Sequence, residues 1–175
     1  MRITEESTTS VIVDVQERLL GVMYEAEATV DRITTLIHGL NALTVPLLVT
    51  EQYPKGLGPT VEAVRAAVTS DGEERWDPIV KSAFSCCDDD TFSVRLSAVA
   101  DDRGGTILIA GIEAHVCVLQ TTIDLLERGY APVVVADAVS SRNPRDRDIA
   151  FRRVEREGGR LTTVESVLFE LTRIS

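Results

Sequence analysis

Short apolar runs alternate with longer amphipathic stretches along this chain of 175 residues. Six of the runs are rich in β-branched residues and almost continuously apolar, which is typical of strands covered on both faces. We therefore predict strands over residues 10–15, 46–50, 78–81, 106–110, 132–137 and 161–164. The helical patterns between them indicate an α/β fold: a doubly wound, mainly parallel six-stranded sheet with helices on both faces.

Capping residues mark several of the predicted helices. Asn143 followed by Pro144 is typical of a helix start, and Gly158 of a helix end. Thr60 is expected to cap a helix that reaches about residue 68, and the acidic run 88–90 to cap the next one. Helical spacing after Cys117 predicts a buried stripe made of Val116, Leu119, Ile123 and Leu126.

Length and charge limit the possible functions. The chain has the size of one domain, so we expect residues 1–175 to fold as a single unit. A net charge of −10 disfavours nucleic acid and anionic membrane surfaces as partners. Because no apolar run approaches the roughly 20 residues of a membrane span, and the first residues are polar, we expect a cytoplasmic protein.

The cysteines and histidines fit neither a disulfide framework nor a metal site. Cys86 and Cys87 are adjacent, Cys117 stands apart, and no C-x-x-C pair occurs. The two histidines, His38 and His115, have no ligand spacing. We expect reduced thiols and no metal or other cofactor; a G-x-G-x-x-G fingerprint and a P-loop are also absent.

Three chemically useful side chains follow predicted strands. Asp14 lies at the end of the first strand, Lys81 at the end of the third, and Cys117 just beyond the fourth. The carboxyl ends of parallel strands share one edge of the sheet, where ligands bind. Alone, Asp14 could cap a turn, Lys81 could extend to solvent and Cys117 could be a core residue. Together they predict a nucleophilic site, and a helix N-terminus beside Lys81 would lower the pKa of Cys117 below about 8.5.

Four motifs give the whole chain a family resemblance. They are residues 13–16 (VDVQ), 49–59 (VTEQYPKGLGP), 80–85 (VKSAFS) and 111–118 (GIEAHVCV). With these motifs the chain resembles the isochorismatase-like cysteine hydrolases, and the second motif is similar to that of small hydrolases with mostly undefined substrates. The resemblance implies hydrolysis of a small amide-like substrate through a covalent thioester-type intermediate.

Roles for individual residues also follow from this resemblance. It implies that Cys117 is the nucleophile, Asp14 the general base and acid, and Lys81 an electrostatic stabiliser. It implies a cis peptide between Ile112 and Glu113, with an oxyanion hole formed by the N–H groups of Glu113 and Cys117. The same edge of the sheet is expected to supply pocket residues, namely Gln16, Gln52, Tyr53, Phe84 and His115.

The chain differs from two branches of the family, and these differences exclude some of the activities that the resemblance would allow. Nicotinamidases carry metal-binding histidines after the second strand, whereas residues 51–56 contain none, so neither nicotinamide nor zinc is expected. Isochorismatases proper lack the nucleophilic cysteine, so Cys117 argues against vinyl-ether hydrolysis. A catalytically idle binding or scaffold protein of the same fold remains the alternative. The loop 51–59, rich in Tyr, Pro, Gly and Leu, suits a homo-oligomer contact.

Overall fold

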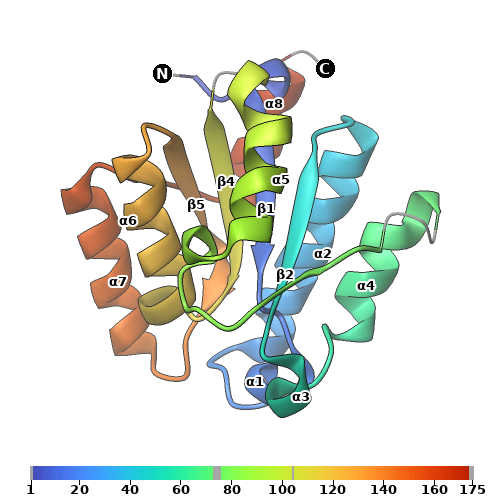
Figure 1. Ribbon diagram of the computed structural model, residues 1–175, viewed down its shortest axis with the longest axis vertical. Helices are drawn as coiled ribbons and strands as arrows, with labels where there is room; N and C mark the ends of the chain where they lie inside the picture. The colour runs from blue at the N-terminus through green and yellow to red at the C-terminus, as the bar shows by residue number, and fades with distance from the viewer. Residues whose placement is uncertain (1, 73–75, 104, 174–175) are drawn as a thin grey trace.

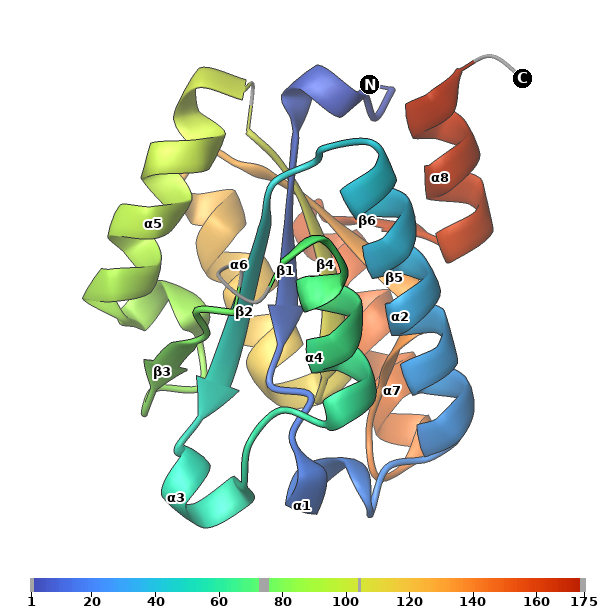
Figure 2. The ribbon, with the colours of Figure 1, turned by 90° about the vertical axis from the view of Figure 1, so that its right-hand side faces the viewer.

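The computed structural model describes residues 2–72, 76–103 and 105–173. A six-stranded sheet with the order β3-β2-β1-β4-β5-β6 forms its centre, and every pair of neighbouring strands is parallel. Figure 1 shows β2, β1, β4 and β5 side by side, and Figure 2 also labels β3 and β6. The strands are β1 (Thr8–Val13), β2 (Leu47–Gln52), β3 (Ile79–Lys81), β4 (Thr106–Ile112), β5 (Ala131–Ser140) and β6 (Arg160–Thr162). The predicted fold class is confirmed.

Helices cover both faces of the sheet. One face is covered by α2 (Ala26–Ala42), α4 (Glu62–Val68) and α8 (Val164–Thr172). The other is covered by α5 (Asp90–Ala100), α6 (Leu119–Glu127) and α7 (Pro144–Glu157), as Figure 2 shows for α5 and α6. Two one-turn helices, α1 (Glu17–Leu20) and α3 (Pro54–Leu57), lie at the carboxyl edge of the sheet. None of the described helices is long and apolar enough to cross a membrane.

The central strands are buried on both faces, and this explains their unbroken apolar character. Along β1, Ile12 packs into the cluster beneath α2, whereas Val11 and Val13 pack into the cluster beneath α5 and α6. All six residues of β1 and all seven of β4 are buried. Alternate side chains of one strand therefore supply two hydrophobic cores.

The strand order changes direction between β1 and β4. From β1 the chain proceeds to β2 and β3 on one side, then crosses to β4, β5 and β6 on the other. Such a switch point opens a crevice at the carboxyl ends of the two strands. Asp14 follows β1 directly, and Cys117 follows β4 by one turn, so both lie at the carboxyl ends of these two strands.

Gly111 allows β1 and β4 to approach each other closely. Its φ is +118°, and a Cβ atom added there would lie 2.1 Å from the Val13 carbonyl oxygen. Such an approach is open only to glycine. The backbones of β1 and β4 are therefore in close contact just before the turn that carries Cys117.

Three of the predicted capping residues are confirmed and one is wrong. Gly158 ends α7 with a left-handed backbone (φ +103°). Asn143 caps α7 by accepting from the Arg145 N–H, and Asp89, from the acidic run, caps α5. Thr60 does not cap α4, because its hydroxyl donates to the buried carboxylate of Glu51 instead, at 2.8 Å.

The predicted stripe of the helix after Cys117 is also wrong in part. Leu119 is buried, but Val116, Ile123 and Leu126 are only half-buried. The other buried positions of α6 are Thr121, Thr122 and Leu125. Residues 114–118 form a π-helical turn, which rotates the following face, and both threonine hydroxyls are hydrogen-bonded and therefore tolerate burial.

Candidate active site

A buried ion pair joins the first and third strands. Lys81 Nζ lies 2.7 Å from Asp14 Oδ2, and both side chains are fully inaccessible to solvent. Asp14 has a left-handed backbone (φ +52°) directly after β1, and Lys81 is the last residue of β3. A lysine side chain spans the width of β2 between them. Two of the three residues predicted to act together are therefore in direct contact.

Lys81 is surrounded by acceptors that fix its ammonium group. Besides Asp14, Nζ donates to Gln52 Oε1 at 2.8 Å and to the carbonyls of Ala83 and Phe84 at 3.2 and 3.1 Å. Burial is the largest single influence and lowers the pKa of Lys81. The negative charge of Asp14, the nearby Cys86 and Cys117 and the hydrogen bond to Asp14 together outweigh burial, so the pKa lies above its ordinary value. Lys81 thus stays a fixed positive charge.

Thr50 holds the second oxygen of Asp14. Its hydroxyl donates to Asp14 Oδ1 at 2.7 Å, while Cys86 Sγ lies 3.9 Å from the same hydroxyl oxygen. The Cys86 N–H in turn donates to Thr121, on the helix that follows Cys117. Both carboxylate oxygens of Asp14 are therefore held by named donors, one charged and one neutral.

Cys117 lies in the π-helical turn between β4 and α6. The N–H groups of Val116 and Val118, on either side of it, both donate to the Glu113 carbonyl, at 3.1 and 3.2 Å. The Cys117 side chain belongs to the core cluster beneath α5 and α6, and the residue is only 5% exposed. It is a free thiol, as are Cys86 and Cys87.

The predicted low pKa of Cys117 is wrong. Burial raises the pKa of the thiol, the negative charge of Asp14 and a hydrogen bond to it raise it further, and Lys81 opposes this shift without reversing it. Lys81 is already paired with Asp14, so little positive potential is left for the sulfur. The resting group is therefore a thiol with a base beside it.

The turn before Cys117 has the implied cis peptide bond, between Ile112 and Glu113. The Glu113 side chain is buried, and its Oε2 accepts from the backbone N–H and the Nε–H of Arg142, at 3.0 and 3.1 Å. His115 Nδ1 lies 2.9 Å from the hydroxyl of Ser141. The segment after β5 is thus joined to the Cys117 turn at two points.

Of the five expected pocket residues, Gln16 is the clear correction. It is fully buried, and its amide group donates to the carbonyls of Gln52 and Gly58 and accepts from the Gln52 N–H. Gln16 therefore joins two loops and does not face a ligand. The strand β2 runs two residues further than predicted, so Gln52 ends it and orients Lys81.

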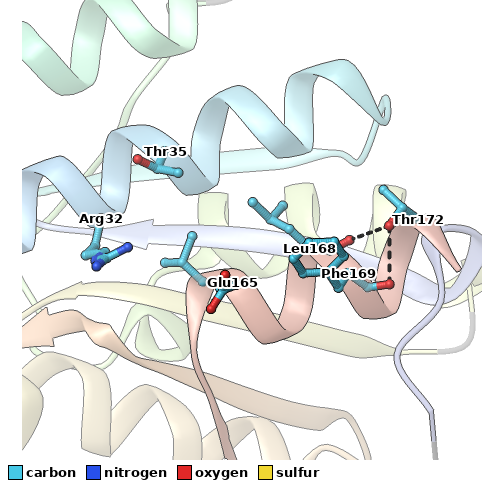
Figure 3. A pocket seen from close by; sticks show the side chains of 7 residues that line it. Arg32, Thr35, Glu165, Leu168, Phe169 and Thr172 are labelled. Carbon is cyan, nitrogen blue, oxygen red and sulfur yellow. Dashed lines mark hydrogen bonds between the residues drawn. The ribbon is translucent and has the colours of Figure 1, made fainter. Parts of the chain in front are cut away.

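The other three expected pocket residues lie at the carboxyl edge. Tyr53 and Phe84 are 59% and 56% exposed, and His115 is half-buried. A cavity of about 350 Å³ next to Lys81 includes Tyr53 and Asp89 in its lining. A separate apolar groove of about 470 Å³ lies between α2 and α8, where Figure 3 shows Leu168 and Phe169. That groove contains no member of the predicted site.

Thr50, Cys86 and Arg142 are the neighbours of the site that sequence reasoning missed. Thr50 could have been found, because the predicted second strand ends on it and parallel strands end at one edge. The proximity of Cys86 and Arg142 has no local signal. It depends on how the segments after β3 and β5 fold back toward β4.

A family model and a curated relative match almost the whole chain. The model described as "Isochorismatase domain" matches residues 8–166. "Isochorismatase family protein 1B" of Dictyostelium discoideum is 37% identical over 172 residues, which cover 98% of this chain and 82% of that protein.

Solved structures agree with the fold over the same span. "MAR1 Ribonuclease" from Caenorhabditis elegans has a TM-score of 0.89 at 38% identity, over 100% of this chain and 86% of that one. YcaC from Pseudomonas aeruginosa, solved with hexane-2,5-diol and covalent acrylamide, has a TM-score of 0.88 at 25% identity, over 99% and 84% of the two chains.

Proposed function

This chain belongs to the isochorismatase family, and from that premise we propose that it is a cysteine-dependent, metal-independent hydrolase of small amides. The observation that carries the proposal is the buried Asp14–Lys81 pair at the switch point, with Cys117 beside it. An acid, a fixed cation and a thiol at one point are the parts that acyl transfer to sulfur needs.

The first half of the reaction forms the thioester. As Cys117 attacks the amide carbon, its S–H proton passes to Asp14, which already interacts with the thiol. The substrate carbonyl oxygen becomes negative and is stabilised by the N–H groups of Glu113 and Cys117. When the C–N bond breaks, Asp14 returns the proton to the leaving nitrogen, and the acyl group remains on sulfur.

The second half restores the enzyme. A water molecule gives a proton to Asp14 and attacks the thioester carbon; the C–S bond then breaks, and Asp14 returns the proton to the sulfur. Lys81 moves no proton in this scheme. Its ammonium donates to Asp14, Gln52 and two carbonyls, so it keeps the oxygens of Asp14 oriented through both halves.

Replacing the nucleophile tests the proposal. Wild-type protein and the Cys117→Ala variant are compared in hydrolysis of small amides and ureido acids, with release of the amine or ammonia as the readout. Cys87→Ala is the matched control, because Cys87 is also buried in the core beneath α5 and α6. We expect activity in the wild type and control and none in Cys117→Ala; equal activity in all three contradicts the proposal.

Acrylamide provides a second readout. It is an amide with an electrophilic carbon, and it is covalently bound in the YcaC structure. We expect mass spectrometry to find one adduct on this protein, at Cys117, and none on Cys117→Ala. The alternative function, a catalytically idle binding protein, predicts that no adduct and no turnover depend on Cys117.

Metal independence is part of the proposal. Among the described residues, no group of three or more His, Cys, Asp and Glu side chains is placed to hold a metal ion. Protein dialysed against a chelator should keep its full hydrolytic rate. Loss of that rate with recovery on adding zinc would contradict this part.

Cleavage of RNA, which the name of the Caenorhabditis elegans relative suggests for that protein, is not what we propose here. A net charge of −10 repels phosphate backbones. At the centre of the site the charges of Asp14 and Lys81 cancel, so no positive charge is left there for a phosphate. We therefore propose small molecules as substrates.

We also propose a second copy of the chain as partner, because Tyr53, Val80 and Phe84 leave large apolar groups exposed at one edge.

A further inference from the structure

Cys86 is a second buried thiol beside the proposed catalytic groups. Its S–H donates to the Thr50 hydroxyl oxygen, which lies 3.9 Å from Cys86 Sγ, and that hydroxyl donates to Asp14 Oδ1 at 2.7 Å. Cys117 is hydrogen-bonded to the side chain of the same aspartate. A chain of hydrogen bonds through Thr50 and Asp14 therefore connects the two thiols.

The backbone also holds Cys86 against the elements around Cys117. Cys86 begins a short 3-10 turn (Cys86–Asp88), and its N–H donates to Thr121 Oγ1 at 2.9 Å. Thr121 follows Cys117 by about one helical turn, so these two residues share a face. Both thiols belong to the core cluster beneath α5 and α6. Cys86 thus comes to the Cys117 turn from the segment after β3.

The same two charges act on both thiols. Burial raises the pKa of Cys86 and of Cys117 most, the charge of Asp14 raises it further, and that of Lys81 lowers it. The two thiols therefore share one electrostatic environment, with one base beside both.

Cys87 is adjacent in the sequence but lies in different surroundings. After burial, the strongest influences on the pKa of its thiol are Arg128, which lowers it, and Asp124, which raises it. These two residues belong to the region of α6 and its C-terminal end. Cys87 is therefore a matched control for Cys86.

We propose that Cys86 is a resolving thiol: after a peroxide has oxidised Cys117, Cys86 forms a disulfide with it that a thiol reductant reopens. Cys117 is 5% exposed and Cys86 is fully buried, so the oxidant reaches Cys117 first. The disulfide itself needs only the two thiols and Asp14, whereas its effect on hydrolysis rests on the proposed function.

The first step oxidises Cys117. Its sulfur attacks one oxygen of hydrogen peroxide, and its proton passes to Asp14. The O–O bond breaks, the leaving hydroxide takes that proton and becomes water, and Cys117 remains as a sulfenic acid.

The second step forms the disulfide. Cys86 attacks the sulfenic sulfur while its proton passes through the Thr50 hydroxyl to Asp14, along the hydrogen bonds described above. The S–O bond breaks, and the hydroxyl group leaves with that proton as water. One peroxide is thus reduced to two waters, and two thiols are oxidised to one disulfide. Without Cys86, further peroxide would carry the sulfenic acid irreversibly to a sulfinic acid.

Peptide mapping tests whether the disulfide forms. Folded protein is treated with hydrogen peroxide, then unfolded and alkylated without reduction. We expect the peptides of Cys86 and Cys117 to be linked, with loss of two hydrogen atoms, in the wild type and in Cys87→Ala, and unlinked in Cys86→Ser. Because the link requires Cβ atoms about 3.5–4.5 Å apart, it measures the approach of the two residues directly. No link in Cys87→Ala overturns the proposal.

Recovery from oxidation tests the role of Cys86. After peroxide and then dithiothreitol, the wild type and Cys87→Ala should regain most of their own starting rate of amide hydrolysis. Cys86→Ser should regain less than about a tenth and carry a sulfinic acid at Cys117. If Cys86→Ser recovers as fully as the wild type, the proposal is wrong.

The two readouts separate this inference from the proposed function. If the Cys86–Cys117 disulfide forms but no amide is hydrolysed, the hydrolase function fails and the resolving thiol stands. If hydrolysis depends on Cys117 but no disulfide forms, the resolving thiol fails and the hydrolase function stands.

Discussion

At the scale of single residues, the hydroxyl of Thr50 has a specific role in this site. It donates its single proton to Asp14 Oδ1, while Lys81 occupies Oδ2. A carboxylate held at both oxygens cannot rotate away from the thiol beside it. Thr50 therefore acts as a positioning residue for the proposed base.

Thr50→Val should lower kcat by about 10- to 100-fold with little change in KM, because one hydrogen bond to a charged group is lost while the shape of the side chain is kept. Thr50→Ser, which keeps the hydroxyl, should recover most of the rate. Steady-state kinetics and a thermal melt of both variants make the comparison. A Val variant with normal kcat, or one whose loss appears only in KM, contradicts the assignment.

The raised pKa of Cys117 predicts how this thiol reacts with alkylating agents. Since the thiolate is the reactive form and the pKa lies above its ordinary value, the rate with iodoacetamide should still rise above about pH 10, where a thiol with the ordinary pKa of about 8.5 has levelled off. Peptide mapping of Cys117 at a series of pH values, with a short unstructured cysteine peptide blocked at both ends as reference, measures this. A plateau near neutral pH would restore the low pKa that the sequence suggested.

At the level of elements, the close approach of β1 and β4 limits which residues can occupy position 111. Gly111 has φ +118° and lies against the Val13 backbone, so a methyl group there has no room. Gly129, after α6, also has positive φ (+83°) but nothing within 4 Å of an added Cβ. The two glycines share a backbone constraint and differ in packing.

Gly111→Ala should cost about 3–5 kcal/mol of the free energy of unfolding, because the two strands must separate or distort. Gly129→Ala should cost only about 1–2 kcal/mol, as expected for an alanine in the left-handed region. Denaturant unfolding of both variants gives the comparison. Equal losses would mean that the close strand approach contributes no stability.

For the whole molecule, three buried thiols link stability to pH. Burial raises the pKa of Cys86 to about 12 and of Cys87 to about 11, and that of Cys117 is raised as well. In the unfolded chain these groups lose their protons near about pH 8.5. Between these limits the folded state binds more protons, so stability must fall as the pH rises.

The free energy of unfolding should therefore be constant up to about pH 8 and then decrease by about 1.4 kcal/mol per pH unit for each thiol that stays protonated. Urea unfolding at a series of pH values from neutral to about pH 10 measures the slope. Cys86→Ala should reduce it by one thiol's share. A stability that rises across this range would contradict the pKa directions.

Self-association is the other property of the whole molecule. Tyr53, Val80 and Phe84 are each more than half exposed near the short edge strand β3, and burying them in a second copy removes apolar area from water. Light scattering should give a mass above one chain, reduced by Val80→Asp and unchanged by Lys55→Glu in the neighbouring helix α3. A single-chain mass at all concentrations would contradict this.

The features that the sequence determined by itself are local ones or ones that follow a repeated pattern along the chain. Continuous apolar runs identified six strands, and the capping of α7 by Asn143 followed from the residue types. Asp14, Lys81 and Cys117 could be placed at one edge, because parallel strands end together whatever their order. The cis peptide bond between Ile112 and Glu113 followed only from the family resemblance.

Only the tertiary structure decided which groups surround each of these residues. The contacts of Thr50 with Asp14 and of Arg142 with Glu113 join residues 36 and 29 positions apart, and they depend on strand register. Gln16 was misplaced because the same residue type can face a ligand or join two loops. The pKa of Cys117 was predicted in the wrong direction because burial and neighbouring charge, which decide it, arise only when the chain packs.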